Sequence, residues 1–358
     1  MRAEYKRLGD YIQQVDVRNT DVKVSQLVGL TIDKAFIKSV ANTIGTDFSK
    51  YKVIRRNQFA CSLMQVSRDG KMPVAMFEGD VAIMSPAYPM FEVVSKTDLL
   101  PEYLMLWFSR SEFDREASFY AVGGVRGSLE WDDFCNMRIP VPSIEKQRRI
   151  VAQYQTVENR IKNNERLIVL LEDTAQTIFR HRFVDNIDTN NLPEGWRMGT
   201  VGELFELQRG FDLPEQNRHE GNYPIYASTG ITSYHNEFKV TAPGVVTGRS
   251  GTIGKVMYVH NDFWPLNTTL YVKNCSGSSF EFAYYKLQEL QLDKTVAGFA
   301  AVPTLNRNDV HAMQSIIPPK TTIKEFSRIS RAIFSYIEVV RRENDILRET
   351  ANTLTSKL

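Results

Sequence analysis

The segment Leu170-Leu171-Glu172-Asp173-Thr174-Ala175-Gln176-Thr177-Ile178 returns 176 residues later as Ile346-Leu347-Arg348-Glu349-Thr350-Ala351-Asn352-Thr353-Leu354. The same shift, without a gap, places Ser128-Leu129 on Thr304-Leu305 and Asp133-Phe134 on Asp309-Val310. A weaker match, Leu8-Gly9-Asp10 against Val201-Gly202-Glu203, opens the two halves at a shift of 193. The chain is therefore a tandem duplication, in which a divergent body precedes a better-kept tail, and this predicts two similar tasks at two places.

Both tails predict long helices. Residues 143–185 and 320–358 contain neither Gly nor Pro, and their apolar residues recur at alternating spacings of four and three. Such a period, kept over about four heptads, indicates a coiled coil, and a helix of about 40 residues is roughly 60 Å long. The seam of each helix is its stripe of a and d residues. It includes Ile161, Asn164, Ile168 and Leu171 in the first tail, and Ile337, Val340, Asn344 and Leu347 in the second.

One asparagine interrupts each seam. Asn164 falls at a d position and Asn344 at an a position, and antiparallel coils pair a layers with d layers. We therefore expect an antiparallel pair in which the two asparagines fix the register at some cost in stability. This register places Ile161 against Leu347, Ile168 against Val340 and Leu171 against Ile337. The alternative is that each helix packs on its own globular domain, with the asparagines at the rim.

The divergent bodies predict a mixed fold in which strands prevail. Short β-branched runs separated by Gly and Pro are typical of strands, and we expect one helix near 101–118 and another near 279–292. The expected class is α+β, with two β-rich domains at 1–142 and 186–319 that are separated by two long antiparallel helices at 143–185 and 320–358. The expected strands are 81–84, 91–94, 245–247, 255–259 and 269–272.

Composition excludes several classes of protein. Apolar content of 42% and a net charge of +2 describe a globular chain that neither requires nor excludes nucleic acid. Three scattered cysteines, no apolar run of eighteen residues and no signal-like start favour a cytoplasmic protein without a membrane anchor. The run Gly248–Lys255 is not a phosphate-binding loop, because Arg249 stands where Gly is required and Val256 where Ser or Thr is required. The five histidines show no metal-ligand spacing.

Several short motifs, doubled and in order, resemble the specificity subunits of Type I restriction–modification enzymes. They are Leu-Pro-Glu-Gly-Trp at 192–196, Ser-Pro-Ala-Tyr at 85–88, Gly-Gly-Val-Arg-Gly at 123–127 and Ile-Pro-Val-Pro at 139–142. The resemblance covers nearly the whole chain, although the first body lacks the Leu-Pro-x-Gly-Trp opening, so its N-terminal edge is expected to be shorter or differently arranged.

The resemblance implies a non-catalytic subunit that recognises double-stranded DNA. Each domain would read half of a split, asymmetric target, while the helices set the spacer and dock two modification subunits. Restriction subunits would join the same complex. S-adenosylmethionine, ATP and Mg²⁺ would be used by these partners, and this chain would bind no cofactor or metal.

Base recognition needs polar side chains on loops, because it works by hydrogen bonding to base edges. A solvated surface position is the alternative for each residue chosen. The helix cations Arg148, Arg149, Arg160, Lys162 and Arg166 are expected to be a solvated face, with partner docking as the alternative. The expected DNA-binding residues are Arg68, Lys71, Ser85, Tyr88 and Arg126 in the first body, and Tyr226, Ser228, Arg249, Ser250, Lys255 and Asn267 in the second, with Arg55 and Arg56 as phosphate contacts.

Other functions remain open from the sequence. The chain is also compatible with the specificity subunit of a fused restriction–methylation enzyme, or with an adaptor whose duplicated domains bind two proteins instead of DNA. A stand-alone methyltransferase is disfavoured, because the sequence has no Asn-Pro-Pro-aromatic loop and no dinucleotide-binding fingerprint.

Overall fold

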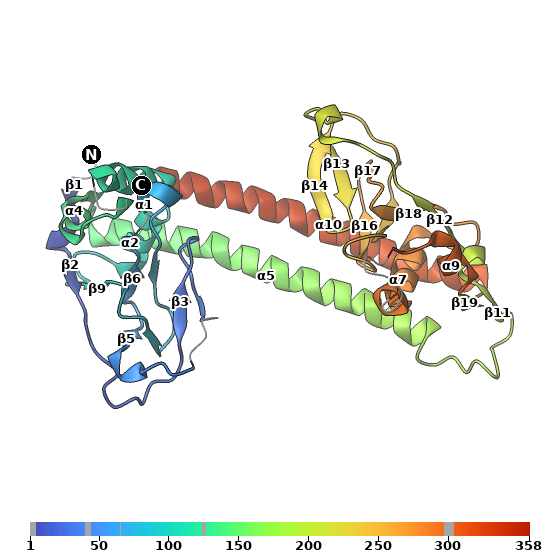
Figure 1. The fold of residues 1–358 in the computed structure, drawn as a ribbon, viewed down its shortest axis with the longest axis horizontal. Helices are drawn as coiled ribbons and strands as arrows, with labels where there is room; N and C mark the ends of the chain where they lie inside the picture. Colours follow the sequence, from blue (N-terminus) through green and yellow to red (C-terminus); the bar gives the residue numbers. More distant parts are fainter. Residues whose placement is uncertain (1–4, 40–43, 65, 124–126, 297–303) are drawn as a thin grey trace. The chain divides into compact units, whose positions relative to one another are not determined.

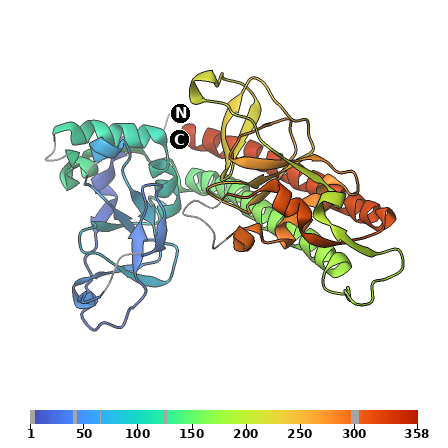
Figure 2. The same cartoon turned by 45° about the vertical axis from the view of Figure 1, so that its right-hand side comes forward.

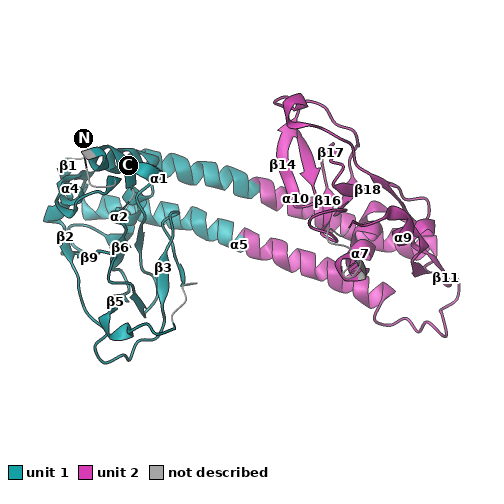
Figure 3. Cartoon of the chain, in the orientation of Figure 1, with its two compact units in different colours: residues 1–163, 343–358 teal, residues 164–342 magenta. Residues whose placement is uncertain are grey.

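The computed structural model describes residues 5–39, 44–64, 66–123, 127–296 and 304–358. The chain divides into two compact units, coloured separately in Figure 3. Unit 1 combines residues 1–163 with 343–358, and unit 2 comprises residues 164–342. Each unit thus holds one body and a segment of each long helix.

Two long helices follow the two bodies, as the tails predict (Figure 1). Helix α5 spans Ile144–Phe183 and α10 spans Lys320–Ser356. The start of α5 is tied to the first body by Gln147, whose side chain is fully buried. Its amide donates to the carbonyls of Asp98 and Pro142 and accepts from the backbone N–H of Leu100.

The helix segments run antiparallel within each unit. In unit 2, Arg341 bonds Glu172 at 2.9 Å and Arg182 approaches Glu325 at 3.7 Å, so residue numbers rise on α5 as they fall on α10. In unit 1, Arg160 makes two hydrogen bonds to Glu343, at 2.9 and 3.1 Å. The predicted antiparallel coil is therefore confirmed.

The seam residues are mostly buried. Ile161, Ile337 and Val340 are buried, and Ile168 and Leu171 pack against the same apolar cluster as Ile337, whereas Leu347 is half-buried. Asn164 and Asn344 are each 2% exposed, so the alternative that placed them at the rim is wrong. Their proposed shared layer stays a prediction.

The body of unit 1 is built from short strands and helices around one main core. Its central sheet has the order β2-β9-β6-β7, with antiparallel neighbours. Phe59, Phe91, Phe108 and Phe134 are fully buried over it. The strands are β1 Tyr5–Arg7, β2 Ile12–Gln14, β3 Val28–Leu30, β4 Phe36–Lys38, β5 Lys52–Arg55, β6 Phe59–Cys61, β7 Val74–Met76, β8 Val81–Met84, β9 Met90–Val93 and β10 Arg138–Pro140. The short helices are η1 Leu8–Asp10, η2 Phe48–Lys50, α1 Val66–Asp69, α2 Pro101–Phe108, α3 Ser111–Tyr120, η3 Ala121–Gly123 and α4 Trp131–Asn136.

The body of unit 2 holds a sheet of order β12-β18-β15-β16 and a second sheet of order β14-β13-β17. Helix α7 packs on the first sheet and, through Phe282 and Tyr285, on the long helices (Figure 2). The strands are β11 Arg197–Thr200, β12 Glu206–Arg209, β13 Tyr223–Ala227, β14 Gly230–His235, β15 Gly244–Gly248, β16 Val256–Val259, β17 Trp264–Pro265, β18 Thr269–Asn274 and β19 Gln314–Ile317. The short helices are α6 Val201–Leu204, η5 Glu215–Asn217, α7 Phe280–Glu289, α8 Leu292–Val296 and α9 Arg307–Ala312.

The sequence repeat is also a structural repeat. Strand β1 pairs antiparallel with β10 just as β11 pairs with β19, and α4 and α9 occupy matching places 176 residues apart. The N-terminal edge of the first body keeps this pairing although it lacks the Leu-Pro-x-Gly-Trp opening, and its strand β1 (Tyr5–Arg7) is shorter than β11 (Arg197–Thr200). The mixed α+β class is confirmed.

One predicted helix is divided. The segment expected as a single helix near 101–118 is split into α2 and α3, and Ser109 and Arg110 lie between them. The N–H of Ser109 still closes the turn on Met105, while Arg110 leaves the helix with extended backbone angles and stacks its guanidinium 4.1 Å from the ring centre of Trp107. The helix expected near 279–292 is α7, capped by Ser279.

Candidate nucleic-acid interface

The turn between β15 and β16 presents polar side chains on a fixed backbone. The N–H groups of Arg249 and Ser250 both donate to the carbonyl of Thr268, at 2.9 and 3.2 Å, and the carbonyl of Arg249 accepts from Leu305. Gly251 and Gly254 adopt φ values of +79° and +78°, which favour glycine. The run is thus a glycine-containing hairpin, as predicted, and not a phosphate-binding loop.

Arg249 lines a hollow of about 720 Å³ together with two further arginines, Arg209 and Arg307. Its guanidinium donates to the carbonyl of Asn267 at 3.4 Å and forms no ion pair with any residue of the described ranges. The Asn267 amide hydrogen-bonds the carboxylate of Asp212, which lies 3.8 Å from Arg209. A hollow lined by three arginines and one carboxylate carries a net positive charge, which suits phosphate oxygens or base edges.

Other predicted residues of this body lie apart from that hollow. Tyr226 and Lys255 line a smaller one of about 300 Å³, where the Lys255 ammonium donates to the Thr229 carbonyl at 2.5 Å. Burial raises the pKa of Tyr226 to about 12, so its hydroxyl stays protonated. Ser228 is buried, and a Cβ added to Gly251 would lie 3.3 Å from its Oγ. The Ser228 side chain thus lies close to the turn, and its buried hydroxyl is not accessible to a large ligand.

The predicted cations of the first body are mostly neutralised by carboxylates. Arg56 lies 2.7 Å from Asp80, Arg68 2.7 Å from Asp69, and Lys71 3.1 Å from Asp33. Arg68 lies in α1, and Gly70 after it has a φ of +64°. A phosphate approaching any of these cations would have to displace a carboxylate.

The remaining predicted residues of the first body differ in exposure. Arg55 is exposed at the end of β5. Ser85 accepts a weak hydrogen bond from the Ala87 N–H, and Tyr88 is half-buried against an apolar cluster. Arg126 lies outside the described residues.

Sequence reasoning missed Arg209 and Arg307. A signal for Arg307 existed, because the 176-residue shift aligns it with Trp131, so the second copy carries a cation where the first carries an aromatic ring. Arg209 precedes Gly210 at the end of β12, and a Cβ on that glycine would clash with the Leu266 carbonyl at 2.2 Å. This close backbone approach brings two loops of the hollow together, but it depends on a pairing that the sequence does not reveal.

The described part of the chain holds neither a cluster of metal-ligating side chains nor a helix suited to a membrane. No set of three or more His, Cys, Asp and Glu side chains is placed to hold a metal ion. No helix within these ranges has the length and apolar character that a membrane crossing requires.

Comparison with known proteins bears on this architecture. Residues 193–356 match the family model described as Type I restriction modification DNA specificity domain. The Type I restriction enzyme MjaIX specificity subunit of Methanocaldococcus jannaschii is 19% identical over 301 residues, which cover 74% of this chain and 70% of that protein.

Two solved structures share the fold. The S subunit of a Type I restriction–modification system from M. genitalium superposes with a TM-score of 0.64 at 14% identity, over 99% of this chain and 95% of that one. A chain from a structural study of complex assembly and conformational transition of the type I R-M system gives a TM-score of 0.52 at 17% identity, over 99% and 97%. The second half of this chain therefore carries a Type I restriction modification DNA specificity domain, and the first half repeats its elements.

Proposed function

We propose that this chain is the DNA sequence-recognition subunit of a Type I restriction–modification complex, in which each body reads one half of a split target. The observation that carries the proposal is the element-by-element duplication, with β1–β10 and α4 in one copy and β11–β19 and α9 in the other. A repeated scaffold with divergent loops suits a target of two different half-sites. The target is therefore asymmetric.

In this proposal the long helices set the spacer of unread bases. DNA half-sites on one face of the duplex recur about every 34–36 Å, and a helix of 40 residues is about 60 Å long. A helix pair of this length is able to bridge one such interval.

The same helices would dock the two modification subunits. Apolar side chains remain exposed on both helices, each more than half exposed, and two of them, Leu170 and Ile346, occupy matching places of the repeat. The others are Val169 on α5 and Tyr336 and Val339 on α10. Exposed apolar positions on an otherwise charged helix favour packing of a further helix. Adenine methylation with S-adenosylmethionine, and cleavage that uses ATP and Mg²⁺, would belong to the modification and restriction subunits. The complex would act on cellular DNA in the cytoplasm.

Methylome sequencing tests the proposal. A host that expresses this chain with its cognate modification subunit should acquire a split, asymmetric, adenine-methylated motif, and the motif should vanish when this chain is deleted. If the modification subunit co-purifies with the chain and no such motif appears, DNA recognition is not its function and a protein adaptor becomes the better description.

A further inference from the structure

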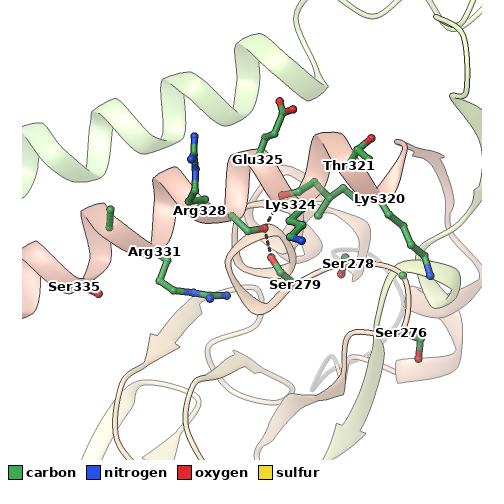
Figure 4. Close-up of a pocket in the computed structure, with 14 residues that line it drawn as sticks. Ser276, Ser278, Ser279, Lys320, Thr321, Lys324, Glu325, Arg328, Arg331 and Ser335 are labelled. Carbon is green, nitrogen blue, oxygen red and sulfur yellow. Dashed lines mark hydrogen bonds between the residues drawn. The ribbon is translucent and has the colours of Figure 1, made fainter.

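A second basic hollow lies in unit 2, on the first four turns of α10. It has a volume of about 1060 Å³ and is walled on one side by the loop Ser276–Ser279 (Figure 4). Four cations of α10 line it: Lys320, Lys324, Arg328 and Arg331. Figure 4 shows Lys320, Lys324 and Arg331 extending toward the loop, and Arg328 on the side nearer α5.

Three of these cations are free to bind an external anion. Arg331 is paired with the buried carboxylate of Glu281 at 2.8 Å, and the one acid in the lining, Glu325, approaches Arg182. Lys320, Lys324 and Arg328 are exposed and make no ion pair with any residue that the structure describes. The hollow therefore carries a net excess of three positive charges.

Helix stability does not explain this charge. Cations near a helix N-terminus oppose the macrodipole, which favours acidic residues there. Helix α10 has no acidic residue in its first turn, whereas α5 has Glu145. Lys320 and Lys324 thus occupy positions where the helix macrodipole disfavours cations.

The set of four cations occurs in one copy of the sequence repeat only. The 176-residue shift aligns the four cations with Ile144, Arg148, Ala152 and Gln155, so the first copy retains one cation of four. A surface that docks two identical subunits should be present twice. This site therefore serves an interaction that each chain makes once.

We infer that Lys320, Lys324 and Arg328 bind backbone phosphates of double-stranded DNA outside the bases that are read. The inference rests on the proposed function, since DNA is the polyanion which that function supplies. The three residues are spaced four apart, so their backbone positions rise by about 6 Å from one to the next along α10. Exposed cations without aromatic partners suit phosphates, which position DNA without specifying its sequence.

The test measures how salt weakens DNA binding by the complete complex with its modification subunits. Each phosphate contact adds about 0.9 to the slope of log affinity against log salt. The variant Lys320→Gln/Lys324→Gln/Arg328→Gln should lower that slope by about 2.7. The ratio of the DNA affinity of the native complex to that of the variant complex should therefore fall about 40-fold between 50 and 200 mM salt. The methylated motif should not change, because the hollow reads no bases.

A matched control has the same change in charge on α5. Lys146→Gln/Arg148→Gln/Arg149→Gln removes three exposed cations near the start of that helix and should leave the slope nearly unchanged. An unchanged slope in the α10 variant overturns the inference. A variant that loses only its association with the modification subunit also overturns it, because the occupant of the hollow would then be an acidic protein segment. If the native complex itself neither binds nor methylates a specific motif, the proposed function fails first. Should the triple variant misfold, the single variants, each expected to lower the slope by about 0.9, decide the question.

Discussion

The two bodies share a framework but are joined to the long helices by different side chains. In the second body, Phe179, Phe183 and Phe326 of the helices pack on Phe282 and Tyr285 of α7, with ring centroids 5.0–5.7 Å apart. In the first body, α5 contributes Ile150, Val151 and Tyr154 to the core, and Leu358 packs there after the end of α10. We call the contact between each body and the long helices its joint. Duplication has kept the position of each joint and has changed the side chains that form it.

The same contrast holds for the candidate DNA-binding cations. Arg56, Arg68 and Lys71 of the first body are paired with carboxylates, whereas Arg249 of the second body lines a hollow beside two other arginines. A common scaffold therefore does not imply equal contributions to binding. The larger share of the affinity is expected from the second body.

The largest expected effect is on the aromatic joint. Phe179→Ala should destabilise unit 2 by about 3–5 kcal/mol, because a fully buried ring is lost and a cavity remains. The matched change in the first joint, Val151→Ala, removes two methyl groups and should cost about 2 kcal/mol. Hydrogen exchange measured on peptides from each unit reports the two losses separately. Equal losses would show that the joints do not differ in strength.

A smaller effect is expected from the buried carboxylate of Glu281, which is 1% exposed. Burial acts to raise its pKa, but the hydrogen bonds from Arg331 oppose this, and the pKa lies below the usual 4.5. Its stabilising contribution is therefore present above about pH 4.5 and is lost as the pH falls through the lowered value. Arg331→Met should cost about 1–3 kcal/mol at neutral pH, because the carboxylate loses its partner.

The pH dependence distinguishes this mechanism from loss of packing. Without Arg331 the pKa of Glu281 should rise, so the difference between variant and native protein should shrink in acid, where the carboxyl is protonated. Denaturation experiments at pH 7 and pH 4 measure this difference in the free energy of unfolding. The control Arg328→Met, at an exposed position on the same helix, should change stability by less than about 0.5 kcal/mol at both pH values.

The framework could be predicted from the sequence, because it depends on periodic patterns. The 3.5-residue period of the tails and the 176-residue repeat predict α5, α10 and their antiparallel pairing. The strands at 81–84 and 245–247 follow from β-branched runs between glycines and prolines. The break between α2 and α3 was not predictable, because Ser109 and Arg110 are compatible with a helix and the turn depends on packing around Trp107.

The candidate site was predictable only in part. The Gly248–Lys255 hairpin was recognisable, since Gly251 and Gly254 mark the turn. The partners of its side chains were not, because Arg209 and Arg307 reach the hollow from strands and helices distant in sequence. Nor could the sequence show that Arg68 and Lys71 are paired with acids, since Lys71 and Asp33 are 38 residues apart.

The smallest expected effect concerns DNA binding and tests the contrast between the bodies directly. Arg249→Ala should weaken binding of the complete complex to its target about tenfold, which corresponds to about 1.4 kcal/mol, because an unpaired guanidinium is lost. Arg68→Ala should weaken it by less than about threefold, since Arg68 must first leave Asp69 to contact DNA. Both affinities are measured at one fixed salt concentration. An Arg68 effect equal to that of Arg249 would mean that DNA displaces the carboxylate readily, and the two bodies would then contribute alike despite their different ion pairs.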